Sequence, residues 1–119
     1  MSFILVPKVG SDIQTNSWNW RPTLLLVADA GILTDEEHER MGANGCGGYV
    51  DAEKTKRIAA LIEAQLAKMK GGERMRADRT VTAQPLELLS EPNELYSASY
   101  DWLSRFHAFC LSSEGFEVV

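Results

Sequence analysis

The sequence predicts a mainly helical α+β domain of about four helices, and it allows a minimal strand pair formed by the two chain ends. Several segments carry apolar residues at helical spacing, and helix start and stop signals flank them. With 119 residues, of which 45% are apolar and 24% charged, the chain has the size and composition of one ordinary globular domain spanning residues 1–119.

The chain ends carry the main strand-like patterns. Residues 3–6 are Phe, Ile, Leu and Val, which suit a half-buried strand, and Pro7 ends the run. Residues 116–119 alternate as an edge strand does, so the two ends are candidates to pair. Residues 80–82 form a third short candidate, and the sequence leaves the conformation of residues 73–90 open.

The first helix is expected to begin at Asn19 as the capping residue, with Pro22 in its first turn and Gly31 as its stop. Its apolar run, Leu24 to Ala28, favours helix because leucine is a strong helix former. A run this short is also compatible with a buried parallel strand, which would make the fold α/β.

Two helix starts carry clear capping signals. Thr34 and Glu37 have the spacing of a capping box, which predicts a short helix over residues 35–41 that Gly42 ends. Asp51 caps the longest predicted helix, which Gly71 and Gly72 end. One face of that helix is apolar apart from a glutamine: Ile58, Leu61, Ile62, Gln65, Leu66 and Met69.

The last helix is expected to begin between Glu91 and Ser99 and to end at Gly115. Its positions share one stripe that faces the core: Leu95, Ser99, Trp102, Phe106, Phe109 and Cys110.

The formal net charge of -5 disfavours nucleic acid as a general partner, because phosphate binding needs clustered cations. Residues 51–79 nevertheless hold eight basic and five acidic side chains. This segment is interpreted as a solvated helix face followed by a charged loop, and the alternatives are docking to an acidic partner or a nucleic-acid contact.

No apolar run approaches the length of a membrane span, and residues 3–6 have no basic flank before them, so we expect a cytoplasmic protein with no membrane contact. Cys46 and Cys110 are expected to be free thiols in a reducing compartment.

A tryptophan-bearing segment is the best candidate for a binding surface. Aromatic residues beside Arg and Asn anchor many protein interfaces, and here they occur together in a segment interpreted as a surface loop: Asn16, Trp18, Asn19, Trp20 and Arg21. At least one indole is expected to be exposed. The alternative is that both indoles close the core, each donating a hydrogen bond.

A glycine-rich loop precedes Asp51 and adds Asn44 and Gly45 to the candidate binding residues. Four glycines within residues 42–48 favour a tight turn with positive φ that aims Tyr49 and Val50 into the core. The loop lacks the lysine of a phosphate-binding P-loop and the alternating carboxylates of a calcium site.

Four side chains could bind a soft metal ion, namely His38, Cys46, His107 and Cys110, but their spacing forms no compact knuckle. No metal, cofactor or catalytic residue is therefore predicted. The remaining enzymatic hypothesis is a small-molecule or metal-dependent enzyme that uses the Asn44–Asp51 loop, with Cys46, Asp51 and one histidine as its polar groups.

Three motifs resemble a family of small uncharacterised bacterial proteins: Asn16-Ser17-Trp18-Asn19-Trp20, Asn44-Gly45-Cys46-Gly47-Gly48 and Gly115-Phe116-Glu117-Val118. The resemblance covers most of the chain and implies no activity. Cys46 stands where that pattern has aspartate.

Taken together, these features predict a small protein-binding module of regulatory or toxin-neutralising type, without catalysis. Its partner would be another protein. Neither the partner's identity nor the oligomeric state follows from the sequence.

Overall fold

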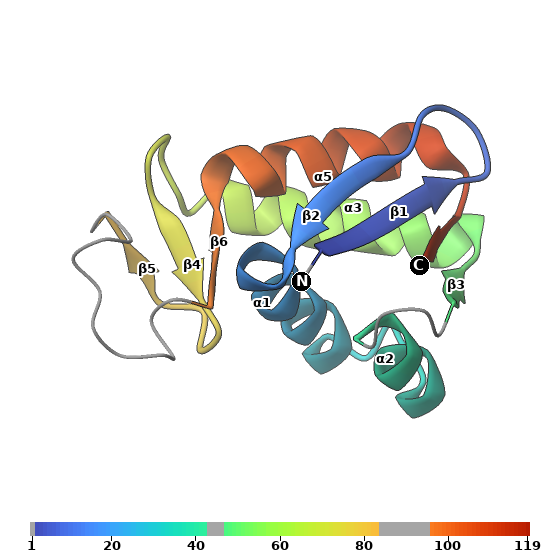
Figure 1. Cartoon of the computed structure of the whole chain (residues 1–119). Helices are drawn as coiled ribbons and strands as arrows, with labels where there is room; N and C mark the ends of the chain where they lie inside the picture. Colours follow the sequence, from blue (N-terminus) through green and yellow to red (C-terminus); the bar gives the residue numbers. More distant parts are fainter. Residues whose placement is uncertain (1, 43–46, 84–95) are drawn as a thin grey trace.

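The computed structural model describes residues 2–42, 47–83 and 96–119, and these form two antiparallel sheets packed with four helices (Figure 1). The prediction of a mainly helical fold with a minimal strand pair is wrong, because seven strands lie within these ranges. The chain is α+β with substantial sheet.

The larger sheet contains four strands in the order β2-β1-β7-β3. Their bounds are Ser2–Pro7 for β1, Ile13–Asn16 for β2, Gly48–Val50 for β3 and Phe116–Val118 for β7. The expected pairing of the chain ends is confirmed, since Leu5 lies opposite Val118. Side chains alternate across the sheet, so that Phe3 and Leu5 are buried while Ile4 is exposed.

The smaller sheet has the order β5-β4-β6, with β4 at Arg74–Arg76, β5 at Val81–Thr82 and β6 at Ser97–Ser99. β5 falls within the candidate strand at residues 80–82. The sequence predicts neither β4 nor β6, because each is three residues long with a single buried apolar side chain, Met75 and Ala98 respectively.

The helices are α1 at Ser17–Asp29, α2 at Asp35–Met41, α3 at Ala52–Leu66 and α5 at Tyr100–Ser113. The structure confirms that residues 24–28 are helical. It also confirms the capping box of Thr34 and Glu37 and the cap at Asp51, whose Oδ1 accepts from the amide of Lys54 at 2.8 Å.

Two predicted helix ends are wrong. Asn16, not Asn19, caps α1, so residues 13–16 form β2 and Pro22 lies in the second turn. α3 ends at Leu66, ahead of Gly71 and Gly72, because the chain tightens into turns whose amides bond three residues back, as from Met69 to the carbonyl of Leu66 at 3.0 Å. Met69 is nevertheless buried.

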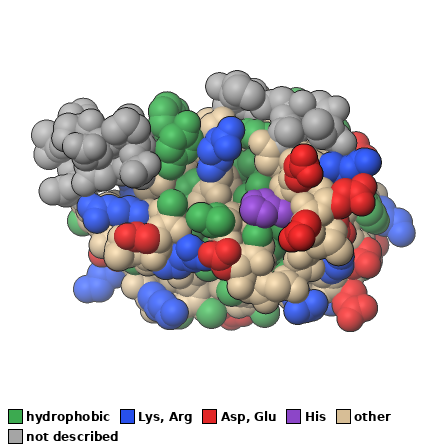
Figure 2. Space-filling view, turned by 90° about the horizontal axis from the view of Figure 1, so that it is seen from below, with side chains coloured by type: hydrophobic (Ala, Val, Ile, Leu, Met, Phe, Trp, Pro, Cys, Tyr) green, Lys and Arg blue, Asp and Glu red, His purple; other side chains and the backbone are tan. Residues whose placement is uncertain are grey.

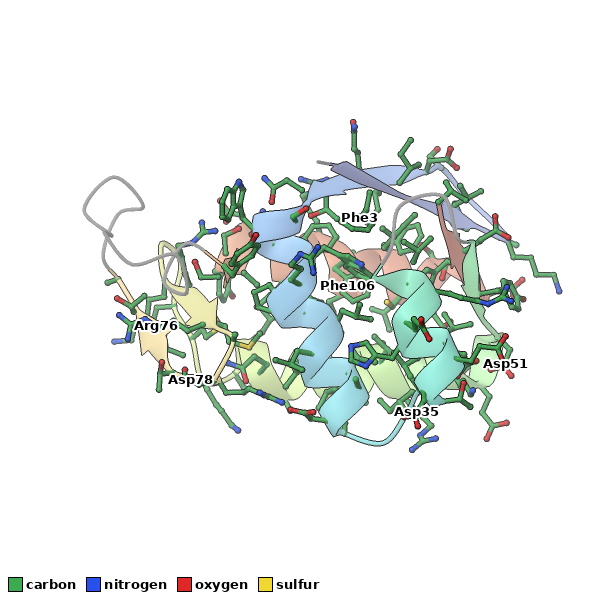
Figure 3. The ribbon with its side chains drawn as sticks, turned by 60° about the horizontal axis from the view of Figure 1, so that its bottom comes forward. Phe3, Asp35, Asp51, Arg76, Asp78 and Phe106 are labelled. Atoms are coloured by element: carbon green, nitrogen blue, oxygen red, sulfur yellow. The ribbon has the colours of Figure 1, made fainter. Side chains whose placement is uncertain are left out.

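Aromatic side chains fill the core between the larger sheet and helices α1, α3 and α5. Phe106 is central: its ring lies 5.3 Å from Trp102, 5.7 Å from Trp20 and 5.9 Å from Phe116. Phe3, on β1, joins this cluster through Trp20, whose ring centre lies 6.3 Å from that of Phe3; Figure 3 labels Phe3 and Phe106. The expected core stripe on α5 is confirmed for Trp102, Phe106, Phe109 and Cys110, while Ser99 caps α5 and Leu95 lies outside the described residues.

The start of α2 is tied to α3 by an ion pair. The Lys54 ammonium lies 2.6 Å from Oε1 of Glu37, and both side chains are partly buried. Burial alone would raise the pKa of Glu37, but hydrogen bonds from Lys54 and Thr34 outweigh it and hold the pKa below 4.5.

Replacing Lys54 by Met is expected to lower the free energy of unfolding at pH 7 by about 1 kcal/mol. Because the pKa of Glu37 is lower in the folded state, this stabilisation is present above the unfolded-state pKa of 4.5 and is lost as pH falls through the folded-state value. Urea denaturation at pH 7 and at low pH measures both effects. Arg40→Ala removes an exposed ion pair with Glu36 and serves as the matched control. If Lys54→Met lowered the free energy of unfolding by the same amount at low pH as at pH 7, the loss could not come from the Lys54–Glu37 ion pair.

Candidate functional site

The first two turns of α1 present two of the predicted binding residues to solvent. The Asn16 side chain fixes the first turn, since its Oδ1 accepts from the amide of Asn19 at 2.9 Å. Trp18 and Arg21 are three positions apart, so they lie on the same side of the helix. Trp18 remains 41% exposed, which is unusual for so large an apolar side chain.

Tyr96 lies against both of these side chains. Its ring centre is 4.8 Å from that of Trp18, and the Arg21 guanidinium carbon is 5.9 Å from the same ring. The three residues, Trp18, Arg21 and Tyr96, are called the aromatic platform below. Sequence reasoning missed Tyr96, because the contact joins residues from distant parts of the chain and no local pattern marks it.

A polar network anchors the platform to the smaller sheet. Oδ1 of Asn19 accepts from the amide of Ser99 at 3.0 Å and from Arg74 Nη2 at 3.4 Å. Arg74 also donates to the carbonyl and hydroxyl of Ser97, and its burial lowers the pKa of its guanidinium. Asn19 is therefore a supporting residue beneath the platform, and the oxygen of its side-chain amide faces the protein.

Trp20 does not belong to this surface. It is only 1% exposed, lies among the core aromatic rings, and donates from Nε1 to the carbonyl of Met41 at 2.8 Å. Of the five predicted residues in this segment, Trp18 and Arg21 form the exposed part, Asn16 and Asn19 hold the helix start, and Trp20 is core. The interpretation of the segment as a loop is wrong.

The glycine-rich loop is described only in part. The candidate residues Asn44 and Gly45 lie outside the described residues, as does Cys46. Gly47 has a φ of 67°, as the predicted turn requires. A Cβ on Gly48 would lie 2.9 Å from the amide nitrogen of Met41, so close packing of β3 on α2 requires glycine there. Val50 is buried as expected, but Tyr49 is exposed and contradicts the prediction.

In the described part of the chain, no arrangement of side chains supports the alternative hypothesis of a small-molecule or metal-dependent enzyme. The Asp51 carboxylate caps α3. Burial raises the pKa of the Cys110 thiol well above its usual range, so the thiol stays protonated. Among residues 2–42, 47–83 and 96–119, no cluster of three metal-binding side chains occurs.

The basic residues of the segment 51–79 are dispersed. Lys54 pairs with Glu37, Arg79 with Asp29, and Arg74 points into the smaller sheet. Figure 3 places Arg76 beside Asp78 at one end of the molecule and Asp35 and Asp51 at the other, and Figure 2 shows acidic and basic side chains interspersed over one face. On the face that Figure 2 shows, basic side chains therefore form no continuous surface of the kind that phosphate binding needs.

One side chain of α5 reaches the outer edge of the larger sheet. β2 is the outer strand, and Nη2 of Arg105 donates to the carbonyl of Gln14 at 3.3 Å. Arg105 also lies over the ring of Trp102, at 5.9 Å from its centre. Sequence reasoning singled out neither Gln14 nor Arg105.

No family model, curated protein or solved structure matches this chain. Within the described residues, no helix combines the length and apolar character that crossing a bilayer requires.

Proposed function

We propose that the chain is a protein-binding module, of regulatory or toxin-neutralising type, whose contact surface is the aromatic platform of Trp18, Arg21 and Tyr96. The observation that carries the proposal is the exposure of Trp18 in a fixed position. Its indole is 41% exposed, yet it lies against Tyr96 on a helix start that Asn16 caps.

The composition of the platform supports a protein partner. Trp, Tyr and Arg are the residues in which interface binding energy concentrates. Trp and Tyr offer large contact area with only two rotatable bonds, and Arg offers a planar, charged group that donates several hydrogen bonds. The polar network beneath the platform limits the ordering cost of binding. Arg21 makes no ion pair among the described residues, so a carboxylate on the partner would complement it.

The proposal predicts that Trp18→Ala abolishes partner binding while leaving the fold intact. We expect the wild-type chain, used as bait in a native lysate, to retain a stoichiometric protein, and Trp18→Ala to bind that protein at least about thirtyfold more weakly, as for a typical hot-spot residue. Isothermal titration with the purified partner measures the ratio.

Tyr49→Ala is the matched control, because Tyr49 is a similarly exposed aromatic residue on β3, at the opposite edge of the larger sheet. It should bind as the wild type does. Equal weakening by both variants would contradict the proposal. If the wild type and Tyr49→Ala were retained on immobilised single-stranded DNA and Trp18→Ala was not, the platform would be assigned to nucleic acid instead.

A further inference from the structure

The outer edge of β2 offers backbone hydrogen-bonding groups to solvent. Ile4 exchanges both of its backbone hydrogen bonds with Val119, at 3.1 and 2.8 Å, so its N–H and C=O point toward β7. Gln14 lies opposite Ile4 in the antiparallel register, so its own N–H and C=O point away from β1. In the described part of the chain, only Arg105 bonds to this side of Gln14.

A shallow, open hollow lies on the surface of α5 near this edge. It is lined by four residues of that helix, Asp101, Ser104, Arg105 and Ala108. Ser104 and Ala108 are small, which leaves room beside the helix. Since Arg105 both lines the hollow and reaches Gln14, the strand edge and the hollow adjoin across its side chain. In Figure 1, β2 passes in front of α5.

An exposed strand edge beside a helix is an arrangement to which extended peptides add as a further strand. We propose that β2 pairs with an extended, carboxylate-bearing segment of the partner protein. The Gln14 N–H and C=O would form main-chain bonds with the added strand, and the hollow would accommodate one of its side chains. This inference rests on the proposed function, because it names how the same partner binds.

The guanidinium of Arg105 and the position of β2 support this occupant, and the carboxylate must bind on the Arg105 side of the hollow because the other charged lining residue, Asp101, is acidic. Arg105 makes no ion pair among the described residues, and its one hydrogen bond there is a 3.3 Å contact to a neutral carbonyl, so a carboxylate would be a stronger acceptor for it. β2 runs directly into α1, which places the end of the strand edge next to the turn that carries Trp18. An added strand would therefore lead toward the aromatic platform.

Gln14→Pro tests the inference at one backbone atom. Proline removes the outward N–H without removing a bond to β1, because Gln14 makes none there. Gln14→Thr is the matched control, since it changes the side chain and keeps the N–H. The probe is a phage-displayed library of random linear peptides, selected on the wild-type chain and followed by titration of the selected peptides.

We expect the selected peptides to be enriched in Asp or Glu and to bind Gln14→Pro at least roughly tenfold more weakly, while Gln14→Thr binds as the wild type does. Arg105→Ala should weaken the binding of acidic peptides, and Arg105→Lys should bind them better than Arg105→Ala does. Circular dichroism verifies that each variant is folded.

Three outcomes would overturn the inference: no selected peptide, equal affinity for Gln14→Pro and Gln14→Thr, or a wild-type dimer that Gln14→Pro dissociates, because the edge would then be occupied by a second copy. The two proposals fail separately. A partner whose binding needs Trp18 but is indifferent to Gln14→Pro leaves the aromatic platform in place and removes only the strand pairing.

Discussion

Trp20→Ala is expected to lower the free energy of unfolding by about 3–5 kcal/mol, the range for removing a large buried aromatic side chain. Trp20 is 1% exposed and its ring lies 5.7 Å from Phe106 and 6.3 Å from Phe3. Its loss would open a cavity at the centre of the aromatic core and leave the Met41 carbonyl without its indole donor. The shift of the urea midpoint at constant m-value measures the change.

Trp18→Ala provides the internal comparison, because it removes the same side chain two positions earlier. We expect it to cost about 1 kcal/mol or less, since Trp18 is substantially exposed and loses mainly its contact with Tyr96. Equal destabilisation by the two variants would contradict the assignment of one indole to the core and the other to the surface.

Thr23→Val is expected to cost about 1–3 kcal/mol, although the two side chains have nearly the same shape. The Thr23 hydroxyl is fully buried, donates to the Asn19 carbonyl at 2.8 Å and accepts from Nε1 of Trp102 at 2.9 Å. Valine would leave the buried indole N–H of Trp102 without a partner. Thermal and urea unfolding measure the loss.

A double-mutant cycle separates this hydrogen bond from packing. In a Trp102→Phe background there is no N–H to orphan, so Thr23→Val should cost distinctly less than in the wild type. Additive effects of the two substitutions would show that the hydroxyl contributes through something other than Trp102.

Helix starts with their own capping side chain were predictable from the sequence. Thr34 and Asp51 each accept from an amide three residues ahead, so the whole interaction lies within four consecutive positions. The α1 start was displaced for a related reason: Asn16 and Asn19 are both capping residues, and pairing of β2 with β1 selects the earlier one.

The sheets were underestimated because their strands are stabilised by distant partners. β4 and β6 are three residues long and carry mostly polar side chains, so neither hydrophobic alternation nor strand propensity distinguishes them. They form because Met75 and Ala98 lie opposite each other and are both buried. No pattern within either segment contains that information.

The candidate site likewise combines residues that local sequence patterns mark and residues that only tertiary contacts bring together. The sequence singled out residues 16–21 as a candidate binding surface, but it could not separate Trp18 from Trp20 while the segment was taken as a loop. In a helix, positions two apart point roughly 200° away from each other, so one indole is buried and the other exposed. Tyr96, Gln14 and Arg105 join the site only through tertiary contacts.

The position of β7 in the larger sheet has a kinetic consequence. β7 lies between β1 and β3, so the four strands form one sheet only when residues 116–118 pair with residues 5–7 as well as with residues 48–50. This closes nearly the full length of the described chain into one loop, which is entropically slow compared with forming helices. The rate of reaching the native state should therefore be governed by how quickly these two remote segments meet.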